Sequence, residues 1–355
     1  MSDVCDKKDA ILLRADIQCC EKDYSISCVR FIAMIFIVVC HMMQKDNFAT
    51  NIGGASIEWA FWFNIGVQMF LFISGYLYGK KKSIDIVRFY KKCFSKILID
   101  YYIFILIILI ITFFLPLLEI DSDGVVGLLT FSGTINGLGH LWFVPTILFC
   151  YLLTPIFFSI INAFDKKSDV RFWIESALLL LIMQIVMMRL FKSFSPVWMN
   201  NFVLGMIYSR LEMRGKKNSY LFAVVTFVLC IVIIPVQFRL DYWLHAEFTG
   251  TAAVLYDYFC AYGHVFGGIF LTIIIRFFFN KLKKRAHPVL EWSDKYNYDV
   301  YLTHPVFVVS ALGCVEFISN RWIALPLAVG LTIITAIILY HTSELVRSRF
   351  TGRVK

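Results

Sequence analysis

The sequence predicts an all-α polytopic integral membrane helix bundle with about ten transmembrane helices and both termini in the cytoplasm. Hydrophobic residues make up 59% of the 355 residues, the mean hydropathy is +0.72, and only 17% of the residues are charged. A soluble domain carries nearer about 25% charged residues. Apolar stretches also recur along the whole chain, each with the about 20 residues that a helix needs to cross a bilayer core.

The apolar stretches define one membrane domain over residues 26–345, since no internal repeat or low-complexity linker divides it. The predicted spans are 27–43, 57–79, 97–117, 140–161, 172–191, 196–209, 219–238, 252–275, 297–317 and 322–342. The sixth is the shortest. Residues 1–25 are polar and lack the basic and apolar regions of a signal peptide, so we expect a cytoplasmic segment there. Residues 346–355 are expected to form a cytoplasmic tail.

Basic residues set the orientation of the helices. The loops after every second span are the basic ones, with Lys80, Lys81, Lys82, Arg88, Lys91, Lys92, Lys96, Lys166, Lys167, Arg171, Arg210, Arg214, Lys216, Lys217, Arg276, Lys281, Lys283, Lys284 and Arg285. By the positive-inside rule these loops are cytoplasmic, and we expect a multi-pass protein of the cell inner (cytoplasmic) membrane. The net charge of +9 then reflects contact with the lipid bilayer, so no nucleic acid is needed as a partner.

The first span carries two ionisable residues, Arg30 and His41, in an otherwise apolar helix. Ionisable groups are costly in hydrocarbon, so their presence within a span suggests a site. Eleven residues return a helix to within about 20° of the same face and advance it about 16 Å. The two side chains therefore share one stripe at two depths, with Arg30 nearer the cytoplasm and His41 nearer the outer surface.

Four other spans contain unusual polar residues. The second has Gln68, Ser74 and Tyr76; the fourth opens with His140 and Trp142; the sixth contains Asn200 and Asn201; and the ninth contains Asp299, Tyr301 and His304, which we expect close to the cytoplasmic face. Taken by its type alone, each of these residues also has a structural explanation, such as helix packing or anchoring at the membrane interface.

Five motifs, in order, resemble the acyltransferase-3 family. They are the Arg-x10-His of the first span, Phe-Leu-Phe-Ile-Ser-Gly-Tyr-Leu at 70–77, Arg-Phe-Tyr-Lys-Lys-Cys-Phe-Ser-Lys at 88–96, His-Leu-Trp-Phe at 140–143 and Tyr-Asp-Val-Tyr-Leu-Thr-His-Pro at 298–305. Each motif alone is weak, but the ordered set spans about residues 25 to 345. The sequence is on this basis identified as a member of that family.

The resemblance implies an integral membrane transferase that moves an acyl group, usually acetyl, from cytosolic acyl-CoA to a sugar hydroxyl of a surface or exported glycan. The family's Arg-x10-His motif carries over to Arg30 and His41. Histidine titrates near neutral pH, which suits His41 as the general base that takes the hydroxyl proton. We expect Arg30 to bind a phosphate of CoA or to orient the thioester. A snorkelling Arg30 and an inert, hydrogen-bonding His41 are the structural alternatives.

Further residues receive expected roles around this pair. Contacts with the donor, acetyl-CoA, are expected from Arg88, Lys91, Lys92, Lys96, Ser74 and His304. The acceptor entrance is expected at His140 and Trp142. Many family members have arginines followed by a proline before the third helix, where this chain has Cys93, Lys96 and Asp100. Lysine binds phosphate as a point charge without the planar fork of arginine. Asp100 is expected to pair with Lys96, and Ser74 has a second interpretation as a nucleophile.

Three questions stay open at this level. The expected acceptor is a glycan or lipid-linked sugar, such as capsule, exopolysaccharide or lipopolysaccharide, and since the sequence has no added extracytoplasmic domain after its last span, a single-module enzyme is favoured over a peptidoglycan-modifying one. Buried charges also occur in proton-coupled transporters, and a non-catalytic partner in glycan assembly is a third class. No metal site is expected, because Cys and His residues lack ligand spacing within a span. The sequence predicts no oligomeric state.

Overall fold

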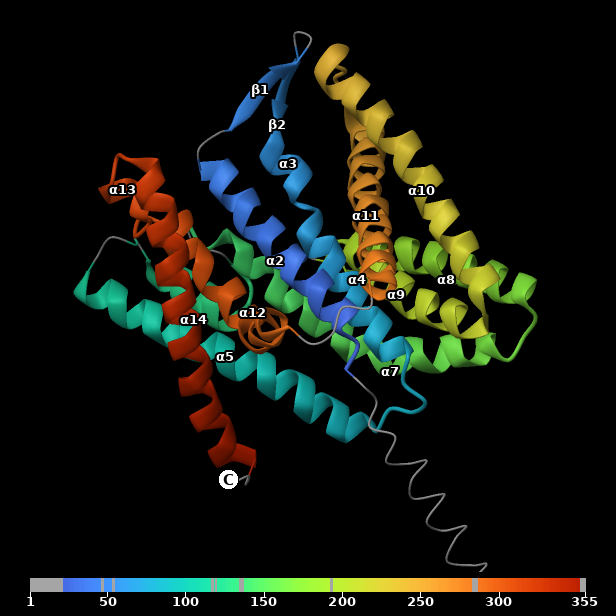
Figure 1. Ribbon diagram of the computed structural model, residues 1–355, viewed down its shortest axis with the longest axis horizontal. Coiled ribbons are helices and arrows are strands. Elements are labelled where there is room, and N and C mark those ends of the chain that lie inside the picture. Colours follow the sequence, from blue (N-terminus) through green and yellow to red (C-terminus); the bar gives the residue numbers. More distant parts are fainter. Residues whose placement is uncertain are drawn as a thin grey trace, which may run out of the picture.

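The computed structural model describes residues 22–351, apart from 46–47, 53–54, 116–117, 119, 134–136, 192–193 and 283–286. The chain forms a bundle of long helices (Figure 1). The long helices are α2 (Tyr24–Lys45), α4 (Ile65–Gly79), α5 (Ile86–Phe114), α7 (Phe143–Asp165), α8 (Asp169–Leu190), α9 (Pro196–Arg214), α10 (Lys216–Phe238), α11 (Gly250–Lys281), α12 (Pro288–Val308) and α14 (Arg321–Thr351). The short elements are β1 (Ala49–Ile52), β2 (Ala55–Glu58), α3 (Trp59–Phe63), α6 (Ser122–Thr130), η1 (Gly139–Trp142), η2 (Arg239–Trp243) and α13 (Cys314–Phe317).

The predicted all-α membrane bundle is confirmed, and each predicted span overlaps a long helix. Eight helical segments of the described chain are long and apolar enough to cross a membrane. The two long helices that fall outside this set are α9 and α12, which carry more polar residues. The predicted ninth span was misplaced: α12 begins at Pro288, whereas the apolar pattern starts only at 297. The first turns of α12 are polar, so the apolar pattern did not indicate where this helix begins.

Helix α9 packs closely against α4 through glycines. A Cβ atom on Gly75 would lie 1.8 Å from the carbonyl oxygen of Phe202, and a Cβ on Gly205 would clash equally with the α4 backbone. The Asn201 side-chain amide in α9 donates to the main-chain and side-chain oxygens of Gln68, at 2.9 and 3.0 Å. Small residues allow such close approach of helices in membranes, and the amide hydrogen bonds fix their register.

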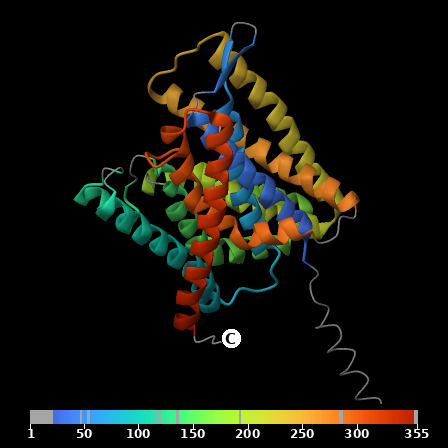
Figure 2. The same ribbon diagram turned by 60° about the vertical axis from the view of Figure 1, so that its left-hand side comes forward.

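Helix α12 lies between α2 and α14, and it packs against both (Figures 1 and 2). The C-terminal part of α14 is tied to α5 by an ion pair in which Arg347 Nη2 lies 2.5 Å from Asp100 Oδ1. Asp100 thus pairs with Arg347, whereas the sequence suggested Lys96. The helix continues to Thr351, so residues 346–351 of the expected tail are helical, and 352–355 lie outside the described residues. Most of the expected N-terminal segment, residues 1–21, lies outside the described residues.

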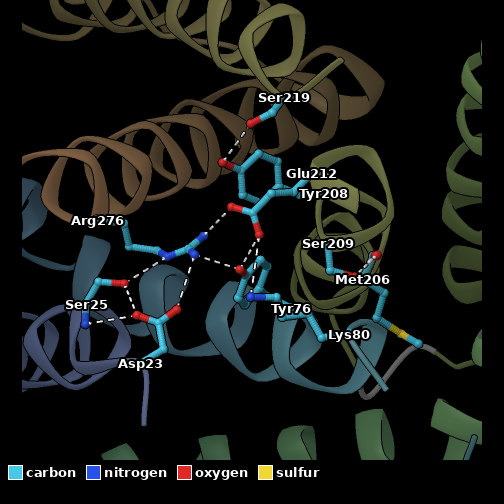
Figure 3. A network of polar contacts seen from close by, with 10 residues as sticks. All are labelled: Asp23, Ser25, Tyr76, Lys80, Met206, Tyr208, Ser209, Glu212, Ser219 and Arg276. Carbon is cyan, nitrogen blue, oxygen red and sulfur yellow. Dashed lines mark hydrogen bonds and ion pairs between the residues drawn. The ribbon is translucent and has the colours of Figure 1, made fainter. Parts of the chain in front are cut away.

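A buried polar network joins the start of α2 to the C-terminal ends of α4, α9 and α11 (Figure 3). The guanidinium of Arg276 in α11 donates to the Tyr76 hydroxyl at 2.6 Å and lies 3.2 Å from a carboxylate oxygen of Glu212. It also lies 3.5 Å from Asp23 and 3.3 Å from the Ser25 hydroxyl, at the start of α2. A buried arginine needs such compensation, because an unpaired charge there is strongly destabilising. The network fixes the beginning of the helix that carries Arg30.

Candidate active site

A cavity of about 330 Å³ lies among α2, α4, α5, α7 and α12. Four residues predicted to contact a donor line it: Arg30, Ser74, Lys92 and Lys96. They come from three helices and from sequence positions far apart. The structure therefore brings together three of the basic residues that the sequence analysis assigned to the donor, Arg30, Lys92 and Lys96.

The cavity follows the predicted stripe of α2. Arg30, Met34 and Ile37 line it, at spacings of four and three residues along the helix. His41 is the next residue on that face, about 6 Å beyond Ile37. The cavity thus extends along most of the about 16 Å of helix that separates Arg30 from His41.

Arg30 is held by Asp294 of α12 at the end of the cavity nearer the N-terminus of α2. Its Nη1 atom lies 3.4 Å from Asp294 Oδ1, and the same carboxylate accepts from the Ser27 hydroxyl at 2.5 Å and lies 2.8 Å from Lys22 Nζ. The Arg30 carbonyl oxygen accepts a hydrogen bond from the Asn297 side chain at 3.3 Å. Arg30 therefore points along the cavity wall in a defined position, which a residue that merely snorkels to the interface does not require.

Three histidines meet beyond the end of the cavity that lies opposite Arg30. The ring centroid of His41 lies 5.2 Å from that of His304 and 6.5 Å from that of His140, and the latter two are 5.6 Å apart. They come from α2, α12 and η1, and both His140 and His304 are buried. Among the described residues, no group of three His, Cys, Asp or Glu side chains is arranged to hold a metal ion.

A proline explains the orientation of His304. Pro305 lacks the N–H that would bond the Tyr301 carbonyl four residues earlier. His304 Nδ1 donates instead to that carbonyl at 2.9 Å, and to the carbonyl of Val300 at 3.1 Å. Since both partners are acceptors, Nδ1 carries the proton and Nε2 keeps its lone pair. Nε2 of His304 is buried without a hydrogen-bond partner.

The other two histidines have similarly defined partners. His140 Nε2 lies 3.3 Å from the Leu302 carbonyl oxygen, which assigns the proton to Nε2 and leaves the buried Nδ1 unpartnered. His41 Nδ1 lies 2.8 Å from Gln44 Oε1 one turn along α2. Donation to this amide oxygen leaves His41 Nε2 as the nitrogen that can accept a proton.

Tyr301 separates the cavity from the histidines. Its ring lines the cavity, and its centroid lies 5.4 Å from that of His140 and 6.1 Å from that of His304. Its hydroxyl donates to the His140 carbonyl oxygen, which links α12 to η1. The sequence analysis noted Tyr301 in a polar stretch but assigned it no role. Its position between the cavity and the histidines depends on the folded chain.

Other predicted residues lie away from the cavity. Arg88 is 87% exposed at its side chain and lies 3.9 Å from Asp85, and Lys91 is also exposed. Trp142 packs its ring on Trp198, with centroids 4.9 Å apart. None of the three is among the residues that line the cavity.

His304 is placed differently from the sequence-based expectation. It was expected near the cytoplasmic face, but it lies beside His41, which the predicted orientation puts toward the outer surface. The correction follows from the early start of α12 at Pro288, which moves His304 into the last turns of that helix. Asp294 and Asn297, which both line the cavity, were missed for the same reason. The predicted span excluded Asp294 and began at Asn297.

The arrangement combines an elongated cavity, cationic at one end, with imidazoles that retain basic nitrogens at the other. The cavity walls carry Arg30, Lys92 and Lys96 against one carboxylate, Asp294. Such a site suits a long molecule that bears phosphates at one end and a reactive group at the other.

Comparison with known proteins agrees with this chemistry. The model of a family described as an acyltransferase domain matches residues 23–341. No curated protein matches the chain, and no solved structure does. The matched region contains every cavity-lining residue and all three histidines named above.

Proposed function

Since the chain belongs to the acyltransferase-3 family and is a multi-pass membrane acyltransferase, we propose that it transfers an acetyl group from cytosolic acetyl-CoA to a hydroxyl of a surface or exported polysaccharide. The inner (cytoplasmic) membrane is the location that gives access to both substrates. The observation that carries the proposal is the stripe of α2, in which Arg30 and His41 lie at opposite ends of the cavity region.

The cytoplasmic end of the cavity supports the choice of donor. Acetyl-CoA carries its phosphates at the far end of an extended arm from its thioester. Lys92 and Lys96 lie one turn apart on α5, and Arg30 faces the same cavity from α2. Their charges suit the nucleotide phosphates, while the apolar wall formed by Met34 and Ile37 suits the arm.

The histidines support direct transfer with His41 as the general base. The acceptor oxygen attacks the thioester carbonyl carbon, the C–S bond breaks, and an ester C–O bond forms. His41 Nε2 takes the hydroxyl proton and returns it to the departing thiolate, so that atoms and charge balance. General acid–base catalysis of this kind contributes about 10²- to 10⁴-fold to the rate. His140 and His304 border the position of the acceptor hydroxyl.

The test uses purified protein in lipid vesicles with radiolabelled acetyl-CoA. Thioester turnover should fall about 10²- to 10⁴-fold in His41→Ala. The matched control is His245→Asn, at an exposed histidine whose positive φ of 44° asparagine tolerates. Its turnover should equal that of the parent protein.

Two results would overturn the proposal. Full turnover in His41→Ala would remove His41 from the chemistry. Uptake of a solute into vesicles without any loss of the thioester would make the protein a transporter. Mass spectrometry of surface glycans, with and without the intact gene, then identifies the acyl group and the acceptor together, because both contribute to the mass difference.

A further inference from the structure

A second cavity, of about 270 Å³, lies between α2, α12 and α14. We call it the α2–α12 groove and define it by Phe31, Ile35, Val38, Val300, Val329 and Ile333, which line it. Ile35 and Val329 are 42% and 38% exposed, so the groove opens to the outside of the bundle at the depth of the membrane core. It runs beside the same helix whose other face lines the donor cavity.

The groove presents hydrocarbon to its contents. Two of the polar side chains along it are engaged elsewhere: the Thr332 hydroxyl donates to the Ala328 carbonyl at 2.7 Å, and the Asn297 amide donates to the Arg30 carbonyl at 3.3 Å. Water needs several polar partners to occupy a cavity, and an apolar cavity instead takes apolar ligands. The natural content is therefore a hydrocarbon chain.

The groove and the donor cavity share a wall. Met34 and Asn297 line both of them. Methionine is flexible and adapts its shape to neighbouring ligands. The groove is therefore directly adjacent to the donor cavity, which sets it apart from an ordinary furrow on the lipid-facing surface.

Both helices lead from the groove to the histidines. Met42 lines the groove and directly follows His41 in α2. Val300 lines it in α12, one turn before His304. A polar head attached to a chain in the groove would leave at the outer end, close to these two imidazoles. The orientation fits a lipid of the outer leaflet, whose chain runs inward from its head.

The size of the groove favours one chain. An apolar cavity of about 150 Å³ accommodates a benzene molecule of six carbons, so by proportion this groove takes roughly ten carbons. That is a segment of a single chain and not the pair of chains of a phospholipid.

We propose that the α2–α12 groove binds the hydrocarbon chain of a single-chain, lipid-linked sugar, and that this lipid is the acyl acceptor. The inference rests on the proposed function and names its acceptor class. The chain lies in the groove, and the sugar hydroxyl reaches His41 from the outer end. The sugar is thus modified while still attached to its membrane carrier.

Photolabelling tests the groove directly. The protein is placed in vesicles of phosphatidylethanolamine and phosphatidylglycerol with a diazirine-bearing polyprenyl phosphate, and the labelled peptides are mapped by mass spectrometry. A diazirine-bearing phosphatidylethanolamine at the same mole fraction is the comparison probe. The polyprenyl probe should label the residues of the groove about tenfold more than the phospholipid probe, and unlabelled polyprenyl phosphate should compete.

A matched pair of variants locates the site. Ile333→Trp fills the groove and should lower labelling by the polyprenyl probe about tenfold. Ile334→Trp is the control, because Ile334 is 55% exposed and does not line the groove. Equal labelling by both probes, or labelling unchanged in Ile333→Trp, would overturn the proposal and identify bilayer phospholipid as the content.

A second assay separates this inference from the proposed function. Hydrolysis of acetyl-CoA without any acceptor depends on His41 and the donor cavity, so it should persist in Ile333→Trp and disappear in His41→Ala, whose labelling should persist. Labelling of the groove without thioester turnover in the parent protein would refute the proposed function alone. Turnover without preferential labelling would refute the groove alone.

Discussion

Lys92→Ala and Lys91→Ala form the sharpest test of the donor cavity, because the two lysines are adjacent in sequence but only Lys92 lines it. A hydrogen bond to a charged group contributes about 1.5–3 kcal/mol. Each 1.4 kcal/mol is tenfold in affinity, so the loss of Lys92 should raise the KM for acetyl-CoA about 10- to 140-fold. Lys96→Ala should act similarly, since Lys96 lines the cavity one turn further along α5.

The lysine effect should appear in KM and leave kcat nearly unchanged, because these groups lie far from the reacting carbonyl and contribute uniform binding. The assay is initial-rate turnover of radiolabelled acetyl-CoA at several concentrations. Raising the ionic strength should reduce the KM effect of the Lys92→Ala substitution, because salt screens the solvent-exposed part of the interaction between lysine and phosphate. Equal increases in KM for Lys91→Ala and Lys92→Ala would show that the lysines act as a diffuse basic patch and would refute the cavity as the donor site.

Three further variants test how the site is supported. Gln44→Ala removes the acceptor that orients His41 and should lower kcat about tenfold. Gln44→Glu keeps an acceptor oxygen and should restore kcat. A Gln44→Ala variant as active as the parent protein would contradict this role. Gly75→Ala should sharply lower the thermal stability measured in detergent, because its Cβ would overlap the α9 backbone, whereas Gly267→Ala, with no atom closer than 3.8 Å, should not. Arg276→Met removes the buried guanidinium that joins Tyr76 to the part-exposed carboxylates of Asp23 and Glu212, and it should cost about 1.5–3 kcal/mol of unfolding free energy in a denaturant titration; an unchanged midpoint would refute the structural role.

The sequence predicted the helices well because apolar length is a direct requirement of the bilayer. It also predicted that Arg30 and His41 share one face, since that follows from helix geometry alone. The structure adds that this face lines a cavity. Local periodicity carries no information about which other helices face the stripe, so the partners of Arg30 and His41 depended on the fold.

The errors have a common physical cause. Asp294 and Asn297 were missed, and His304 was placed at the wrong depth, because the first turns of α12 are polar and lack the apolar pattern of a membrane-spanning helix. These turns face the cavity and the neighbouring helices, so they need not be apolar. The convergence of His140 on His304 was equally beyond the sequence, because it joins residues from η1 and α12 that are far apart in the chain.

The two helices least like membrane spans are among those most enclosed by protein. In α9, fourteen of nineteen residues are buried, and in α12 thirteen of twenty-one, whereas α8 buries four of twenty-two. A helix that faces lipid must be apolar on its outer surface, but a helix surrounded by others can carry amides, carboxylates and imidazoles whose partners lie on its neighbours. In α12 this freedom places Asp294 beside Arg30 and His304 beside His41. A single inner helix, α12, thus contributes residues at both ends of the acyl-transfer path that we propose. Its polar composition, because of which a hydropathy search does not find it, follows from its enclosure by other helices.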